Sequence, residues 1–374
     1  MNFIEVSGTP YEMGFQQGAQ LKGLISNSFE KIINQPEVDY LKPGIIPKNL
    51  FIYLVKKAAS SAEKRAFKNS DKKYLERLNG LSDGAGVKIE ELLFLQALET
   101  YLDKIDYTVR GCTSAGFKPV LIDSGEPVLI KNFDYINIFR EYAIIRKSRP
   151  KDGYSSIDLT YASVTGNHDG MNEKGLVLLY NYGMTTEKVK PRLPLTVIIQ
   201  KILETCTTVP EAIEILKERK YSNGAIVMAG DRDGNLSIIE ISPEHISVRE
   251  PEGDFIAATN KYFTKELIPY NIPENAYFKG NFPGLQELKI QESNNIRYNR
   301  LVQLIESRKQ HDFSSLISIL IDHGEEGIGT DNTICRHNDI FGTTVSAVFY
   351  PVSGKVFIAS GYPCQTEFKE FSIL

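Results

Sequence analysis

The chain has 374 residues, of which 42% are hydrophobic and 24% are charged, and this composition is typical of a folded globular protein with one large domain or two. Its net charge of -4, with no run of lysine and arginine interleaved with aromatics, argues against a nucleic-acid partner. The first residues lack a signal-peptide pattern, and no stretch approaches about 18 consecutive apolar residues. We therefore expect a cytoplasmic protein with no membrane partner.

The chain divides near residue 111 into a helical part and a mixed part. Apolar residues recur at spacings of three and four near 11–33, 47–67, 71–83 and 88–104, which predicts amphipathic helices. Short β-rich runs then predict strands at 113–117, 127–132, 143–146, 175–181, 224–228, 236–241, 246–249 and 255–259. Further helices are expected at 194–206, 209–219, 295–307 and 312–322, and closing strands at 332–337, 343–350 and 355–360. This order indicates packed sheets covered by helices.

The dipeptide Gly111-Cys112, at the start of one of these strands, is the most informative feature of the sequence. A thiol that follows glycine can attack the carbonyl of residue 111, because glycine lacks a Cβ and tolerates the strained backbone of that attack. Hydrolysis of the resulting thioester would free an α-amino group beside the thiol. The reference pKa of such an amine is roughly 7.7 to 8.0, so nucleophile and base could lie on one residue. A buried cysteine that merely begins a strand is the simpler alternative.

The remaining cysteines and the histidines show no metal-binding spacing. Cys206, Cys335 and Cys364 form neither a zinc ribbon nor a redox pair with Cys112, so we interpret the first two as packing residues and give the third no role. We expect no metal and no cofactor. His168 and His337 deserve notice only because a conventional thiol hydrolase would need a histidine near its cysteine.

Five segments occur in an order that resembles the N-terminal nucleophile hydrolases. They are Gly111-Cys112-Thr113-Ser114, Lys131-Asn132-Phe133-Asp134, Asp169-Gly170-Met171-Asn172-Glu173-Lys174-Gly175-Leu176, Ala258-Thr259-Asn260 and Asn332-Thr333-Ile334-Cys335. The opening, from Gly8-Thr9-Pro10 to Gly18, is also similar. The chain specifically resembles the branch of acyl-CoA:6-aminopenicillanic acid acyltransferase (isopenicillin N acyltransferase, peptidase family C45), which is related to the choloylglycine hydrolases.

The resemblance implies roles for individual residues. Cys112 would be the nucleophile, and its freed amine would be the general base. Asp134 matches the aspartate that lies near that amine, and Asn260 matches an asparagine that supplies an oxyanion donor. The alternative for both residues is a purely structural role in a turn at the end of a strand.

Two further assignments are less specific. Asn181 falls where a second oxyanion amide lies in the choloylglycine branch. Arg297 falls where the family places an arginine whose charge favours the thiolate, but Arg300 competes for that role from the same predicted helix. A solvated arginine on a helix face is the alternative for either one.

These observations lead to one expectation and two rivals. The resemblance implies an α+β fold, a four-layer αββα sandwich with a helical N-terminal segment at 1–111 and a catalytic core at 112–374. We expect self-cleavage at Gly111-Cys112, then cleavage of a linear amide C–N bond through a Cys112 thioester. The partners would be a small-molecule amide and, for a transferase, an acyl-thioester donor, with homo-oligomers left open. The rivals are a Cys–His thiol hydrolase without self-cleavage and a catalytically silent protein that binds a small molecule.

Overall fold

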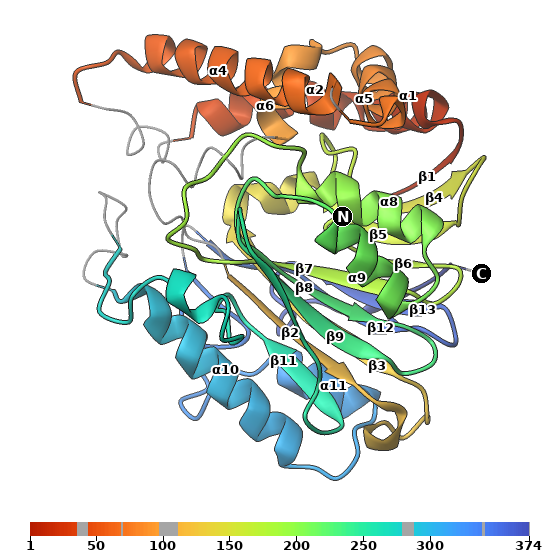
Figure 1. Ribbon diagram of the computed structural model, residues 1–374, viewed down its shortest axis with the longest axis vertical. Helices are drawn as coiled ribbons and strands as arrows, with labels where there is room; N and C mark the ends of the chain where they lie inside the picture. Colours follow the sequence, from red (N-terminus) through yellow and green to blue (C-terminus); the bar gives the residue numbers. More distant parts are fainter. Residues whose placement is uncertain (36–43, 69, 97–110, 279–287, 339–340, 374) are drawn as a thin grey trace.

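The computed structural model describes residues 1–35, 44–68, 70–96, 111–278, 288–338 and 341–373, which form two β-sheets with helices (Figure 1). The larger sheet has eight strands in the spatial order β1 (Asn2–Gly8), β4 (Ala143–Pro150), β5 (Ser156–Tyr161), β6 (Asp169–Asn172), β7 (Val177–Tyr182), β8 (Ala225–Gly230), β9 (Leu236–Ile241) and β10 (Ile246–Arg249). The smaller sheet has six, in the order β11 (Phe255–Ala258), β2 (Gly111–Phe117), β3 (Val128–Ile136), β12 (Phe341–Tyr350), β13 (Lys355–Ser360) and β14 (Lys369–Ser372).

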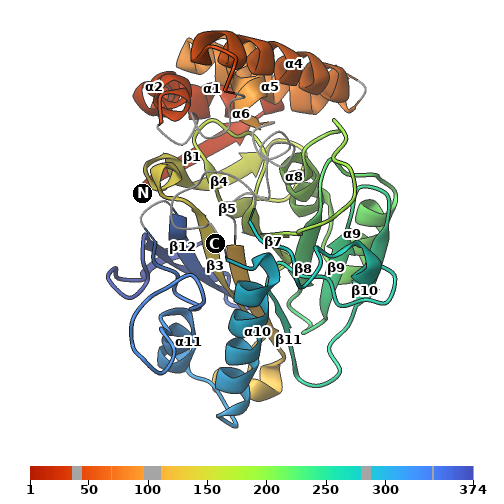
Figure 2. The same cartoon turned by 90° about the vertical axis from the view of Figure 1, so that its left-hand side faces the viewer.

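The two sheets pack face to face and are covered by helices on their outer faces (Figures 1 and 2). Helices α8 (Leu195–Thr205) and α9 (Val209–Lys217) share a buried apolar cluster with β7, β8 and β9. Helices α10 (Ile290–Glu306) and α11 (Phe313–Leu320) share another with β2, β3 and β12. A third cluster fills the space between the sheets. The predicted αββα sandwich is confirmed.

A group of helices from the N-terminal segment lies across one end of the sandwich (Figure 1). They are α1 (Pro10–Gln20), α2 (Lys22–Ile33), α4 (Lys48–Lys68), α5 (Lys72–Ala85) and α6 (Ile89–Gln96). Helices α1 and α5 approach so closely that a Cβ on Gly14 would lie 2.0 Å from the carbonyl oxygen of Arg77, and one on Gly80 would lie 2.1 Å from that of Tyr11. Among the described helices, none has the length and apolarity required to cross a membrane.

The structure corrects the predicted elements in several places. The segment 332–337 is not a strand, because the Thr333 hydroxyl bonds to the carbonyl oxygens of Thr330 and Cys335 and holds a turn. Strands β1, β5, β6 and β14 were not predicted. Strand β1 pairs in parallel with β4, so the predicted helical segment also supplies a strand to the core. The end of the helix predicted at 88–104 lies outside the described residues.

Glu63 on α4 is a buried carboxyl group whose oxygens have no hydrogen-bond partner in the described part of the chain. Burial raises its pKa from 4.5 to about 8. The folded state therefore holds this proton more tightly than the unfolded state, and stability falls as pH rises from about 4.5 toward 8. Between pH 5 and 8 we expect the free energy of unfolding of the wild type to fall by a value on the order of 4 kcal/mol. Glu63→Gln should abolish this fall.

Urea unfolding at pH 5, 6, 7 and 8 measures this effect as the difference between wild type and Glu63→Gln. Glu76→Gln on the exposed side of α5 is the control and should leave the wild-type pH profile unchanged. Parallel profiles for wild type and Glu63→Gln would contradict the prediction.

Candidate active site

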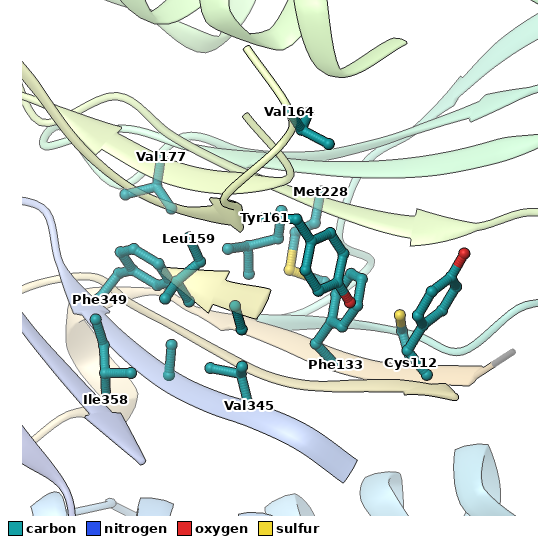
Figure 3. Close-up of a cluster of buried hydrophobic side chains, with 14 of the residues drawn as sticks. Cys112, Phe133, Leu159, Tyr161, Val164, Val177, Met228, Val345, Phe349 and Ile358 are labelled. Carbon is teal, nitrogen blue, oxygen red and sulfur yellow. The ribbon is translucent and has the colours of Figure 1, made fainter. Parts of the chain in front are cut away.

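Cys112 lies in β2, a strand whose seven residues are all buried. In the antiparallel register with β3, Gly111 is opposite Asp134 and Cys112 is opposite Phe133. The Cys112 side chain belongs to the apolar cluster between the sheets, where Figure 3 shows it beside Phe133. Asp134 is one position further along β3 than Phe133, so its side chain points to the opposite face of the sheet. The Gly111–Cys112 peptide therefore has the thiol on one side and the carboxyl group on the other.

Two of the predicted residues hold the main chain of Cys112. The Cys112 N–H donates to Asn260 Oδ1 at 2.9 Å. Arg297 Nη1 donates to the carbonyl oxygen of Cys112 at 2.7 Å, and Arg297 Nη2 donates to Asn260 Oδ1 at 3.1 Å. Cys112, Asn260 and Arg297 are thus brought together around the main chain of one residue, although they are far apart in the sequence.

The helix α10 places Arg297, and not Arg300, at the main chain of Cys112. Its buried face is formed by positions three or four residues apart, namely Ile290, Asn294, Arg297, Leu301 and Ile305. Arg300 lies off this face and pairs with Asp322 at 2.8 Å near the surface. Burial lowers the pKa of Arg297 to about 10, which still leaves the guanidinium charged at neutral pH.

Asp134 lies between two arginines on the outer side of the sheet. Its Oδ2 is 3.7 Å from Arg336 Nη1 and 4.0 Å from Arg297 Nη1, and its Oδ1 accepts a 2.8 Å hydrogen bond from the Thr343 hydroxyl. Burial raises the pKa of this carboxyl group, and the two arginines oppose that rise. Oδ2 has no hydrogen-bond partner in the described part of the chain, so it can accept one from a group that replaces the Gly111 peptide.

A cation that was not among the predicted site residues lies near the Cys112 thiol. Burial raises the pKa of the thiol to about 11, and the positive charge of Lys131 opposes that rise. Lys131 is itself buried on β3, where it pairs with Asp169 at 2.5 Å and lies 4.9 Å from the centre of the Phe133 ring. A lysine within the apolar run of β3 was the sequence signal that could have identified it.

The two candidate oxyanion asparagines differ in their free hydrogens. Within the described residues, Asn260 Nδ2 donates one hydrogen bond, to the carbonyl oxygen of Tyr182 at 2.8 Å, which leaves its second hydrogen for another acceptor. Asn181 Nδ2 contacts Ser114 Oγ at 2.9 Å and the carbonyl oxygen of Thr259 at 3.1 Å, so both of its hydrogens have acceptors. Asn181 thus connects β7 to β2 through its hydrogen bond to Ser114. Its oxyanion role stays a prediction.

The histidines that a Cys–His hydrolase would need have other neighbours. His168 Nδ1 lies 3.2 Å from the Thr160 hydroxyl, and its ring packs against Phe133 and Tyr161. His337 Nε2 lies 3.4 Å from Cys335 Sγ and 3.3 Å from Cys364 Sγ.

Gly111 is required by close packing on the Asp134 side of β2. A Cβ at this position would lie 1.9 Å from Arg336 Nη1 and 3.0 Å from Asp134 Oδ2. We expect Gly111→Ala to displace the Arg336 guanidinium and to lower the free energy of unfolding by about 1–3 kcal/mol. Urea unfolding in a Cys112→Ala background, which lacks the thiol, measures this on an intact chain.

Gly116→Ala is the matched control, because its Cβ would meet the end of the Leu236 side chain at 3.0 Å on the same strand. Gly116→Ala should lower the free energy of unfolding by less than Gly111→Ala does. Equal losses of stability for the two variants would contradict the claim that close packing requires glycine at position 111.

A family model described as acyl-coenzyme A:6-aminopenicillanic acid acyl-transferase matches residues 121–365. The chain belongs to this family. The match covers most of the core, including β3 with Asp134 and α10 with Arg297, and begins after Cys112. It confirms the resemblance to the acyltransferase branch of the N-terminal nucleophile hydrolases.

Individual relatives of this family member are distant. Protein dcd1A of Dictyostelium discoideum is 22% identical over 275 residues, which are 68% of this chain and 62% of that protein. An uncharacterized protein of Archaeoglobus fulgidus is 20% identical over 331 residues, which are 75% of this chain and 54% of that protein. The chain thus spans less than two thirds of the length of these curated relatives.

Solved structures give similarly distant matches. The N-acylethanolamine-hydrolyzing acid amidase ortholog of Caenorhabditis elegans has a TM-score of 0.46 at 16% identity, with 70% of this chain and 99% of that chain covered. A mutant of the conjugated bile acid hydrolase of Clostridium perfringens has a TM-score of 0.42 at 16% identity, with 69% and 96% covered. Penicillin V acylase of Agrobacterium tumefaciens has a TM-score of 0.41 at 13% identity, with 67% and 83% covered.

Proposed function

We propose that this protein is an N-terminal cysteine hydrolase or acyltransferase that cleaves itself between Gly111 and Cys112 and then breaks a linear amide C–N bond. The single observation that carries the proposal is the convergence of Asn260 and Arg297 on the main chain of Cys112, with Asp134 opposite Gly111. Membership of the acyl-transferase family supports acyl-group chemistry at this site.

In the self-cleavage step, Cys112 Sγ attacks the carbonyl carbon of Gly111. A C–S bond forms, the Gly111–Cys112 C–N bond breaks, and the thiol proton passes to the departing nitrogen. Water then hydrolyses the thioester, which returns the thiol and leaves a carboxylate on Gly111. The new amine keeps Asn260 Oδ1 as its hydrogen-bond acceptor, and Asp134 Oδ2, beside the two arginines, balances its charge.

In turnover, the amine of Cys112 takes the thiol proton and Sγ attacks the carbonyl carbon of the substrate amide. The second hydrogen of Asn260 Nδ2 is suited to stabilise the oxyanion. The protonated amine then gives its proton to the leaving nitrogen, and a thioester on Cys112 remains. Water completes hydrolysis, whereas an amine acceptor completes acyl transfer. Lys131 supports the reaction by favouring the thiolate.

The acyl part of the substrate is expected to be apolar. Phe133, opposite Cys112 in the sheet, lines a pocket together with Leu159, Tyr161, His168 and Val345. A neighbouring pocket shares Tyr161 and His168 and continues to Tyr135, Phe139 and Leu95 of α6. An aromatic lining that includes Phe133, the residue opposite Cys112, favours an apolar acyl group.

Intact mass and N-terminal sequencing of the freshly purified protein test the cleavage, and a panel of amides with acyl groups from acetyl to long-chain and arylacetyl tests turnover. We expect fragments 1–111 and 112–374 that elute as one particle, with apolar acyl groups hydrolysed in preference to acetyl. A wild-type chain that stays intact on prolonged incubation would contradict the self-cleavage. Cleaved protein that hydrolyses or transfers none of the amides would contradict the catalytic role.

A further inference from the structure

Four side chains of the types that bind metals, from three separate segments, meet at one end of the smaller sheet, where β12 begins and β13 ends. His323 follows α11, Cys335 and His337 lie in the turn segment before β12, and Cys364 follows β13. One ligand atom from each residue lies within 4.8 Å of all the others. The set of two thiols and two imidazoles is that of structural zinc sites.

The distances between these atoms fit tetrahedral zinc. His337 Nε2 is 3.4 Å from Cys335 Sγ and 3.3 Å from Cys364 Sγ. Zinc bonds of about 2.3 Å to sulfur and 2.0–2.1 Å to nitrogen require separations between ligand atoms of roughly 3.3–3.8 Å in a tetrahedron. A small inward movement of the most distant pair therefore closes the site around one ion.

The surroundings of the two histidines point to a ligand as well. His323 Nε2 is buried and has no hydrogen-bond partner in the described part of the chain. His337 Nε2 faces two sulfur atoms at once, more than a single ring hydrogen can serve. The His337 ring is fixed by stacking on Tyr362, with ring centres 3.8 Å apart, and by the close approach of Gly329.

We propose that His323, Cys335, His337 and Cys364 bind one zinc ion as a structural site. With four protein ligands the ion has no open position, so it stabilises the fold and does not activate water. Cys335 and His337 flank Arg336, the residue that lies against Asp134 and fills the space at Gly111. The ion therefore ties the Arg336 turn to α11 and to the end of β13, and through this turn it positions the surroundings of the scissile peptide.

Metal content tests the proposal without reference to activity. Protein purified under reducing conditions is given one equivalent of Zn²⁺, dialysed against a weak chelator and assayed by mass spectrometry of the metal. We expect about one zinc per chain in wild type, and at least a tenfold lower content in Cys364→Ser and in His323→Ala. Both altered residues are partly exposed, so the variants should elute as folded protein in gel filtration.

Cobalt supplies a second readout of the same site. With Co²⁺ in place of zinc, wild type should show the sulfur-to-metal absorption and the intense visible bands of a tetrahedral thiolate site, and Cys364→Ser should lose the greater part of both. Cys112→Ala and Cys206→Ser each remove a thiol elsewhere in the chain and are the controls, which should match wild type in zinc content and spectrum. Because Cys112→Ala cannot cleave itself, its zinc content also separates this proposal from the proposed function.

Three results would overturn the zinc site. They are wild type that takes up neither metal, a Cys364→Ser protein that holds as much zinc as wild type, and a disulfide between Cys335 and Cys364 in protein kept under reducing conditions.

Discussion

Cys112→Ala should be recovered as one intact chain with no amide hydrolysis, whereas wild type yields two fragments. The thiol is the group that attacks the Gly111 carbonyl, and alanine offers no nucleophile in its place. The space left by the sulfur lies in the apolar cluster between the sheets, so the variant should fold with a loss of only about 1 kcal/mol. Intact mass measures the cleavage, and an amide assay measures the hydrolysis. We expect each to be at least a thousandfold lower than in wild type.

Cys112→Ser refines this test, because a hydroxyl group can replace the thiol at a much lower rate. It should yield fragments slowly, over days where wild type takes minutes to hours. Cys206→Ala removes another buried thiol, at the end of α8, and should be cleaved like wild type. Fragments of normal size from Cys112→Ala would show that a contaminating protease makes the cut.

Arg297→Gln should block cleavage, whereas Arg300→Gln, three residues further along α10, should not. Arg297 donates hydrogen bonds to the Cys112 carbonyl, to Thr113 and to Asn260 from a buried position. Its loss removes these buried hydrogen bonds and leaves Asp134 with one cation fewer, which we expect to cost about 3–5 kcal/mol of stability. Arg300 forms a partly exposed ion pair with Asp322, so its loss should cost no more than about 1 kcal/mol.

The two arginine variants are compared by urea unfolding in the Cys112→Ala background and by the rate of cleavage in the wild-type background. We expect cleavage at least a hundredfold slower for Arg297→Gln than for Arg300→Gln. Arg297→Lys separates charge from geometry, because it keeps the cation but cannot form the fork of hydrogen bonds. Equal rates for the two glutamine variants would remove Arg297 from the site.

The helices and strands that the sequence predicts correctly are those in which the apolar residues recur with a single, regular spacing. The amphipathic helices of the N-terminal segment and the apolar runs of β8, β9 and β12 had clear patterns. The choice between Arg297 and Arg300 was also within reach, because Leu301 and Ile305 extend back by fours to residue 297 on the buried face of α10.

Other parts depended on partners far away in the chain. Strand β6, Asp169–Asn172, has the composition of a turn but is buried between β5 and β7, and its Asp169 pairs with Lys131 of the other sheet. The run around Ile334 has the composition of a strand, but hydrogen bonds of Thr333 fold it into a turn. The spacing of His323, Cys335, His337 and Cys364 matched no metal motif, since their proximity arises only from the packing of α11 against the smaller sheet.

The parallel pairing of β1 with β4 has a consequence for how the cleaved protein would unfold and refold. Residues 2–8 form a continuous ladder with residues 144–150, and Leu95 of the same N-terminal part contributes to the wall of a pocket in the core. A cut after Gly111 would leave these contacts in place but would remove the covalent tether between them. Refolding would then be a meeting of two molecules, and the melting temperature would rise with protein concentration in the cut form but not in Cys112→Ala.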